Sequence, residues 1–234
     1  MDLKGTEVTW LGHGTFKFRT SEGKVVLVDP WVMNNPGCPD AEKNPEQIDL
    51  VLITHAHFDH IGDAVELGRK LEPQTFAIFE TANWLGSKEV PNVTGMNLGG
   101  TVVSEGVSFT MVQAAHSCGI LDDGQIIYGG VAAGYIIRFP GGLRVYYAGD
   151  TTVFGDMKII AELYEPDISI LPIGDFYTMG PREAAYAVKL LGAKTVIPMH
   201  YGTFPVLTGT PDELMGLVGA ATEVVAANPG ETLS

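Results

Sequence analysis

The 234-residue sequence has only two cysteines, Cys38 and Cys118, and no Cys-x-x-Cys motif, so it predicts no disulfide framework. It also lacks any run of about 18 uninterrupted apolar residues, which argues against a membrane-spanning helix. Residues 1–5 lack the basic-then-apolar pattern of a secretory signal. From these absences we expect a cytoplasmic protein that does not insert into membranes.

Basic residues are scarce, with 14 lysines and arginines against 28 aspartates and glutamates, which gives a formal net charge of −14. Proteins bind the phosphate backbone of nucleic acids largely through lysine and arginine, so this balance disfavours a polyanionic partner. A small phosphoester substrate stays open, because bound cations would offset the negative charge locally. Length and hydrophobic content (45%) are otherwise those of a globular protein with a substantial core.

Histidine is rare as well, with six in the chain, yet three of them lie in one heptapeptide at residues 54–60. This heptapeptide, Thr-His-Ala-His-Phe-Asp-His, follows an apolar segment that is typical of a buried strand. Side chains alternate in extended backbone, so His55 and His57 point the same way, while Asp59 and His60 reach a neighbouring point. Three imidazoles and a carboxylate at this spacing suit a divalent transition metal, and two ions more naturally than one.

Other scarce ligands also follow predicted strands. Strands expected at residues 51–53, 107–114, 143–147 and 195–199 precede, in that order, the histidine motif, His116, Asp150 and His200. In α/β architectures, ligands gather beyond the carboxyl ends of strands, so we expect these side chains to meet.

Apolar periodicity predicts the remaining elements. We expect further strands near residues 8–11, 16–18, 24–28, 75–79, 133–139, 167–171 and 223–226, and helices near 63–71, 81–85, 155–164, 181–191 and 211–218. Residues 31–48 and 118–130 are expected to be loops, the second lying over the active face.

The pattern His-x-His-x-Asp-His after a hydrophobic strand resembles the signature of the metallo-β-lactamase superfamily. Trp-Leu-Gly-His near the N-terminus and the segments 175–181 and 200–205 are similar to those of its small bacterial and archaeal metal-dependent hydrolases. The resemblance covers nearly the whole chain. It implies an α/β fold, a four-layer αββα sandwich of two mixed sheets with helices outside. It also implies a single domain over residues 1–234, with pseudo-halves at about 1–130 and 131–234.

Carried over residue by residue, the resemblance implies a site for two metal ions. The implied ligands are His55, His57 and His116 for one ion, and Asp59, His60 and His200 for the other, with Asp150 bridging them. Zinc is the first choice, with manganese, iron and nickel as alternatives. Two such ions generate hydroxide from a shared water at neutral pH, with Asp59 and Asp150 as the expected catalytic carboxylates. The implied reaction is hydrolysis of a small ester, lactone, amide or phosphoester.

Seven further residues are candidates for hydrogen bonds to metal-bound side chains or for substrate contacts: His13, Asp29, Cys118, Asp175, Tyr177, Tyr201 and Thr203. Asp29 precedes a proline at a strand end, where its carboxylate can orient an imidazole, although a plain turn is compatible with the same sequence. His13 is either a proton donor or substrate contact, or a structural histidine in a glycine turn. For Cys118 and the others, packing without a functional role is the competing interpretation.

Three other functions stay open. A mononuclear-iron dioxygenase of the persulfide type would need only His55, His57 and His116. An RNA-processing nuclease is disfavoured by the acidic balance of the chain. A non-catalytic metal-binding protein would have no use for the carboxylate of Asp59. We expect a small-molecule substrate and no nucleic-acid partner, and a homo-oligomer is compatible with the sequence.

Overall fold

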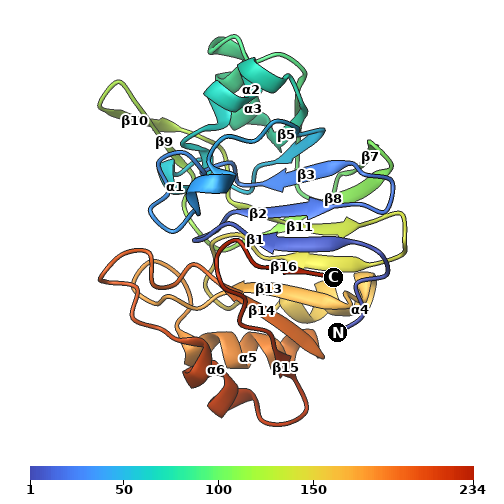
Figure 1. Ribbon diagram of the computed structural model, residues 1–234. Coiled ribbons are helices and arrows are strands. Elements are labelled where there is room, and N and C mark those ends of the chain that lie inside the picture. Colours follow the sequence, from blue (N-terminus) through green and yellow to red (C-terminus); the bar gives the residue numbers. More distant parts are fainter.

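The structure, a computed structural model, describes all residues from 1 to 234 and contains two seven-stranded sheets that face each other (Figure 1). The first has the order β16–β1–β2–β3–β4–β5–β6, with β1 (Glu7–Trp10), β2 (Phe16–Arg19), β3 (Val25–Val28), β4 (Leu50–Leu52), β5 (Gln74–Ile78), β6 (Val93–Met96) and β16 (Thr232–Leu233). The second has the order β15–β14–β13–β12–β11–β8–β7, with β7 (Thr101–Ser104), β8 (Val107–Gln113), β11 (Ala133–Arg138), β12 (Arg144–Tyr147), β13 (Ile168–Pro172), β14 (Thr195–Met199) and β15 (Glu223–Val224).

Both sheets are mixed and follow the same pattern of strand directions. Strands β1, β2 and β3 pair antiparallel, and β3 to β6 pair parallel. In the second sheet, β7, β8, β11 and β12 pair antiparallel, and β12 to β15 pair parallel. The carboxyl ends of β1, β3 and β4 therefore share one end of the first sheet, and those of β8, β12 and β14 share one end of the second.

The helices lie outside the sheets, as Figure 1 shows, with α2 and α3 beyond the first sheet and α4, α5 and α6 beyond the second. They are α1 (Phe58–Ile61), α2 (Ala64–Leu71), α3 (Phe79–Ser87), α4 (Met157–Tyr164), α5 (Pro181–Leu191) and α6 (Pro211–Val218), with a 3₁₀ turn at Asp40–Glu42. None of the helices combines the length and the apolar character needed to cross a lipid bilayer. The predicted α/β architecture of two mixed sheets with outer helices is confirmed.

Adjacent residues of the second sheet point into two different cores because side chains alternate along a strand. Tyr135 and Tyr147 belong to a cluster of 46 buried residues that includes both sheets. Their neighbours Ile136 and Tyr146 belong to a second cluster of 17 buried residues, formed with α4, α5 and α6. Burial on both faces explains why these strands read as nearly continuous apolar runs in the sequence.

Two expectations differ from the structure. The sheets do not divide near residue 130, because β7 and β8 belong to the second sheet and β16 returns to the first. The segment 118–130 is not a loop but a separate hairpin, β9 (Gly119–Asp122) and β10 (Gln125–Tyr128). Its two-residue turn consists of Asp123 (φ 48°) and Gly124 (φ 77°), the Asp-Gly pair that matches the twist of hairpin strands. That the whole chain is a single domain stays a prediction.

Candidate metal centre

All six histidines of the chain lie at the end of the molecule where the two sheets present their carboxyl-terminal strand ends. The residues that follow these strands are His13 after β1, Asp29 after β3, His55 and His57 after β4, His116 after β8, Asp150 after β12 and His200 after β14, while Asp59 and His60 lie in α1. The chain brings these side chains together in three overlapping groups of potential ligands. Two of them contain the expected metal ligands, and the third consists of Asp29, His55 and His60.

The first group consists of His55, His57 and His116. His57 Nδ1 lies 3.1 Å from His55 Nε2 and 3.3 Å from His116 Nε2. Nitrogen ligands about 2.0–2.1 Å from a tetrahedral ion are about 3.3–3.4 Å from one another, so His57 Nδ1 lies at close to ligand spacing from the other two nitrogens.

The second group contains the expected Asp59, His60 and His200 together with His13, and one ligand atom from each lies within 4.8 Å of the others. His13 Nε2 donates a hydrogen bond of 2.9 Å to Asp59 Oδ2, which lies 3.8 Å from His200 Nε2. His13 and His200 are further connected through their backbones, because the His200 N–H donates to the His13 carbonyl at 3.0 Å. His13 is therefore part of this group.

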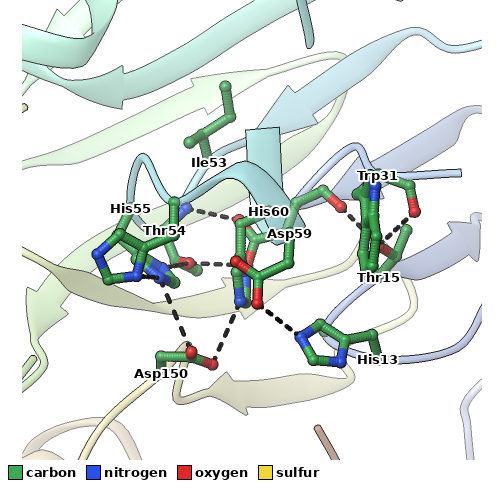
Figure 2. Close-up of polar contacts among 12 residues, drawn as sticks. His13, Thr15, Trp31, Ile53, Thr54, His55, Asp59, His60 and Asp150 are labelled. Carbon is green, nitrogen blue, oxygen red and sulfur yellow. Dashed lines mark hydrogen bonds and ion pairs between the residues drawn. The ribbon is translucent and has the colours of Figure 1, made fainter. Parts of the chain in front are cut away.

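Asp150 lies between the two groups. Its Oδ2 is 3.0 Å from His200 Nε2 and 3.7 Å from His116 Nε2. Figure 2 shows Asp150 beside His55 and His60; Oδ2 is 3.8 Å from His55 Nε2, and Oδ1 is 3.4 Å from His60 Nε2. Burial by itself would raise the pKa of Asp150, but the charges of His200 and His60 hold it well below its usual range. The carboxylate is therefore ionised and faces imidazoles of both groups.

Several polar atoms at this centre are buried without a hydrogen-bond partner in the protein. They are His60 Nε2, Asp150 Oδ1, His13 Nδ1 and both ring nitrogens of His200. Buried polar atoms are normally paired, so such a concentration requires an explanation. Imidazole lone pairs and carboxylate oxygens directed at common points are the donor set that a divalent transition metal binds, and the residues present fit such ions.

Asp29 and Thr54 orient two of the histidines. Asp29 accepts hydrogen bonds from the Thr54 hydroxyl at 2.7 Å and from His60 Nδ1 at 2.8 Å. Because the Thr54 hydroxyl donates to Asp29, its oxygen accepts from His55 Nδ1, 3.0 Å away. Both imidazoles thus carry a proton on Nδ1 and direct Nε2 to the centre, the nitrogen that a metal ion would bind. Sequence reasoning missed Thr54, although its position between a buried strand and His55 was a usable signal.

Burial and charge set the protonation of the surrounding groups. Burial lowers the pKa of His13 to about 4, so this ring is neutral at pH 7 and donates from Nε2. Burial also lowers the pKa of His55. It would do the same at His60, but the carboxylates of Asp150 and Asp29 outweigh it and raise that pKa. For Asp59, burial is outweighed by the hydrogen bond from His13, so its pKa lies well below the usual range.

A cavity of about 810 Å³ opens beside both groups and is bordered by His57, Asp59, His116 and Asp150. Of the other predicted contact residues, only Tyr177 lines it. Cys118 is buried under the hairpin, where its thiol lies 3.2 Å from the Gly129 carbonyl oxygen. Asp175, Tyr201 and Thr203 do not line this cavity. Asp175 borders a separate hollow together with Arg182, and Tyr201 stacks on Trp10. Sequence reasoning missed most of the cavity wall, which includes Phe58, Leu121, Ile126 and Val206.

Comparison with known proteins gives consistent matches along the chain. Residues 24–201 match the family model described as the β-lactamase superfamily domain. A UPF0173 metal-dependent hydrolase of Koribacter versatilis is 54% identical over 234 residues, which is 100% of both chains. Another of Chloroflexus aurantiacus is 48% identical and covers 99% of this chain and 98% of its own. The structure of a metallo hydrolase from the archaeon Ignicoccus hospitalis is 38% identical, with a TM-score of 0.84 over 97% of each chain.

Proposed function

The chain belongs to the metallo-β-lactamase superfamily and is a metal-dependent hydrolase, as predicted, and on this premise we propose that it acts through two divalent metal ions. The proposed reaction is hydrolysis of a small-molecule ester, lactone, amide or phosphoester. Zinc is the proposed metal, because the site offers imidazole and carboxylate ligands and the reaction is hydrolytic.

The observation that carries this proposal is the position of Asp150. Its two oxygens lie 3.0–3.8 Å from imidazole nitrogens of both groups. A single metal site would leave one group of buried, inward-facing histidines without a partner. We therefore assign His55, His57 and His116 to one ion, and Asp59, His60 and His200 to the other, with Asp150 shared by both.

Bound there, two divalent ions would supply Lewis acidity at the scissile bond and lower the pKa of water from 15.7 to roughly 7. The protein side chains would orient the attacking water and the metal ligands. Asp59 stays ionised because His13 donates to its Oδ2, which leaves its Oδ1 free to hold the attacking water. Thr54 and Asp29 keep His55 and His60 in the tautomer that presents Nε2. The neutral His13 ring fixes the orientation of Asp59.

The alternatives have less support. A mononuclear-iron dioxygenase would use His55, His57 and His116 and would leave the buried group around His60 and His200 without a task. For an RNA-processing nuclease, we would expect lysine or arginine beside the centre to bind phosphates, and neither residue type lines the cavity.

Metal analysis of the purified protein tests the proposal. We expect close to two zinc ions per chain in the wild type. His57→Ala should lose one ion and roughly 100-fold or more of the hydrolysis of a generic ester or phosphodiester probe, because the ions would supply both the Lewis acid and the activated water. Asp150→Asn should reduce activity similarly, because it replaces the shared carboxylate. Asp49→Asn is the control, since Asp49 binds Lys24 and Val25 at the start of β3.

One iron per chain, with oxygen uptake on a persulfide substrate, would instead support the dioxygenase. Wild-type metal content and rate in Asp150→Asn would show that this carboxylate is not shared between two ions. Either result would overturn the dinuclear assignment.

A further inference from the structure

The cavity beside the candidate metal centre has a polar floor and apolar walls. His57, His116, Asp59 and Asp150 form its inner end. The surrounding wall is built from four separate parts of the chain: the hairpin β9–β10, the start of α1, Tyr177, and residues 204–206. Figure 1 places the hairpin and α1 at the same edge of the two sheets.

One face of the hairpin forms the first wall. Leu121 and Ile126 are paired across the two strands, so their side chains lie on the same face, and both line the cavity. Leu121 is 61% exposed and Ile126 is 81% exposed. The next residue, Ile127, points to the other face because side chains alternate along a strand. The apolar pair thus faces the cavity and is not covered by any other part of the chain.

Aromatic side chains form a second wall. Phe58 and Phe204 both line the cavity, and both pack on the buried indole of Trp31, with ring centroids 5.9 Å and 6.1 Å away. Val206, 41% exposed, extends this wall. Because Trp31 supports both rings from behind, this wall is a preformed apolar surface.

No lysine or arginine lines the cavity. Lys88, which contacts the hairpin, is engaged there by Asp122 at 2.7 Å. Arg182 borders a different hollow, together with Asp175 and Asp212. A substrate with negatively charged groups beyond the scissile bond would therefore find no side-chain counter-ion in this cavity, and the only carboxylates in the lining, Asp59 and Asp150, belong to the metal centre. An uncharged apolar group would cover the exposed walls.

We propose that the substrate is an uncharged carboxylic ester or lactone whose apolar acyl chain lies between the Leu121–Ile126 face of the hairpin and the Phe58–Phe204 wall. This inference rests on the proposed hydrolytic function of the same centre. In the reaction, the oxygen of water bonds to the acyl carbon and the bond from that carbon to the alkoxy oxygen breaks. One proton of the water goes to the leaving alkoxide and the other is released from the carboxylic acid, which gives an alcohol and a carboxylate.

A chain-length series tests the proposal on the zinc-loaded protein. We expect kcat/KM for para-nitrophenyl acetate, butyrate, hexanoate and octanoate to rise about fourfold per added methylene, the increment for burying one such group. Hydrolysis of bis(para-nitrophenyl) phosphate should be slower than that of the octanoate. Binding is measured separately by displacing the neutral fluorescent probe N-phenylnaphthylamine with methyl alkyl ketones from butanone to decanone, which cannot be hydrolysed. The longer ketones should displace it at lower concentration.

Ile126→Ser is the informative variant. It should lower kcat/KM for the octanoate by about 10-fold, the value of one buried aliphatic side chain, and change the acetate rate less than about twofold. Val103→Ser is the matched control, because Val103 is 70% exposed on the edge strand β7 and lies outside the cavity. It should leave both rates and the ketone series unchanged.

The outcomes separate this inference from the proposed function. Rates and ketone affinities that do not depend on chain length, or an unchanged octanoate-to-acetate ratio in Ile126→Ser, would overturn the acyl-chain site. If the phosphodiester is then still hydrolysed, the hydrolytic function stands without it. Chain-length-dependent displacement by ketones, with no hydrolysis of any ester, would support the apolar site and count against the proposed reaction.

Discussion

His60 Nδ1 lies 2.8 Å from Asp29 Oδ2, and both side chains are completely buried. The same carboxylate accepts from the hydroxyl and the backbone N–H of Thr54 at 2.7 Å each. Asp29 thus connects the end of β3 to two of the three histidines at residues 55–60, directly to His60 and through Thr54 to His55. One buried acid controls the orientation of one imidazole in each ligand group.

Asp29→Asn should weaken metal binding about 10- to 100-fold, the usual effect of removing a hydrogen-bond partner of a metal-bound histidine. Asparagine tolerates the positive φ of this position (53°), so the backbone should be retained. Its amide nitrogen would face His60 Nδ1–H with a donor instead of an acceptor. Competition against a fluorescent zinc chelator measures the affinity, with Asp49→Asn as the control. An affinity equal to that of the wild type would rule out the orienting role.

Gly14→Ala should displace His60. A Cβ atom at residue 14 would lie 2.6 Å from His60 Cε1, closer than any real contact, so the ring would have to move. We expect a loss of about 1–3 kcal/mol in the free energy of unfolding, typical of overpacking, and loss of the ion assigned to His60. At Gly155 a Cβ atom would meet nothing within 4 Å, so Gly155→Ala should change neither quantity. Urea unfolding and metal analysis give the two readouts. Full metal content in Gly14→Ala would contradict the assignment of His60.

Two helical glycines should respond oppositely to alanine. In α3, a methyl group added at Gly86 would meet only open space, so Gly86→Ala should stabilise the protein by about 0.5–1 kcal/mol through helix propensity. In α2, a Cβ atom at Gly68 would lie 2.5 Å from Val90 Cγ1, so Gly68→Ala should destabilise it by about 1–3 kcal/mol. Equilibrium unfolding in urea measures both. A stability of Gly68→Ala equal to or above that of the wild type would show that the packing of α2 against Val90 is looser than described.

Asp167 should make folding sensitive to acid. It accepts hydrogen bonds from Lys4 Nζ and from the Arg144 backbone N–H, each at 2.8 Å. Burial alone would raise the pKa of Asp167, but these hydrogen bonds outweigh it and lower the pKa. Because the folded-state pKa is depressed, the stabilisation is present above the unfolded value of about 3.9 and is lost as pH falls through the folded value.

Asp167→Asn should therefore reduce the free energy of unfolding by about 1 kcal/mol at pH 7, and the difference should shrink as pH falls below about 4. Urea unfolding of both proteins at a series of pH values measures it. A difference that persists at the lowest pH would mean that the charge of the carboxylate is not what stabilises the fold.

Local sequence signals were sufficient to predict features that depend only on residues close together in the chain. Helix α5 begins at Pro181 and is followed by Gly192 in the left-handed conformation, and both residues are typical of helix boundaries. The scarce ligands after four apolar strands were readable for the same reason, since a strand end is a local feature. The Asp123-Gly124 pair was also a local signal for a hairpin turn, but the many glycines around it favoured the prediction of a loop.

The sequence by itself determined the candidate ligand types, the strands that carry them and the acidic balance that disfavours polyanionic partners. Only the tertiary structure decided that His13 joins Asp59, that Thr54 and Asp29 orient two imidazoles, and that an apolar cavity faces the centre. The physical reason is that these features depend on contacts between segments far apart in the chain. The spacing of residues along one strand cannot report which side chains of a different strand, helix or hairpin will be packed against it.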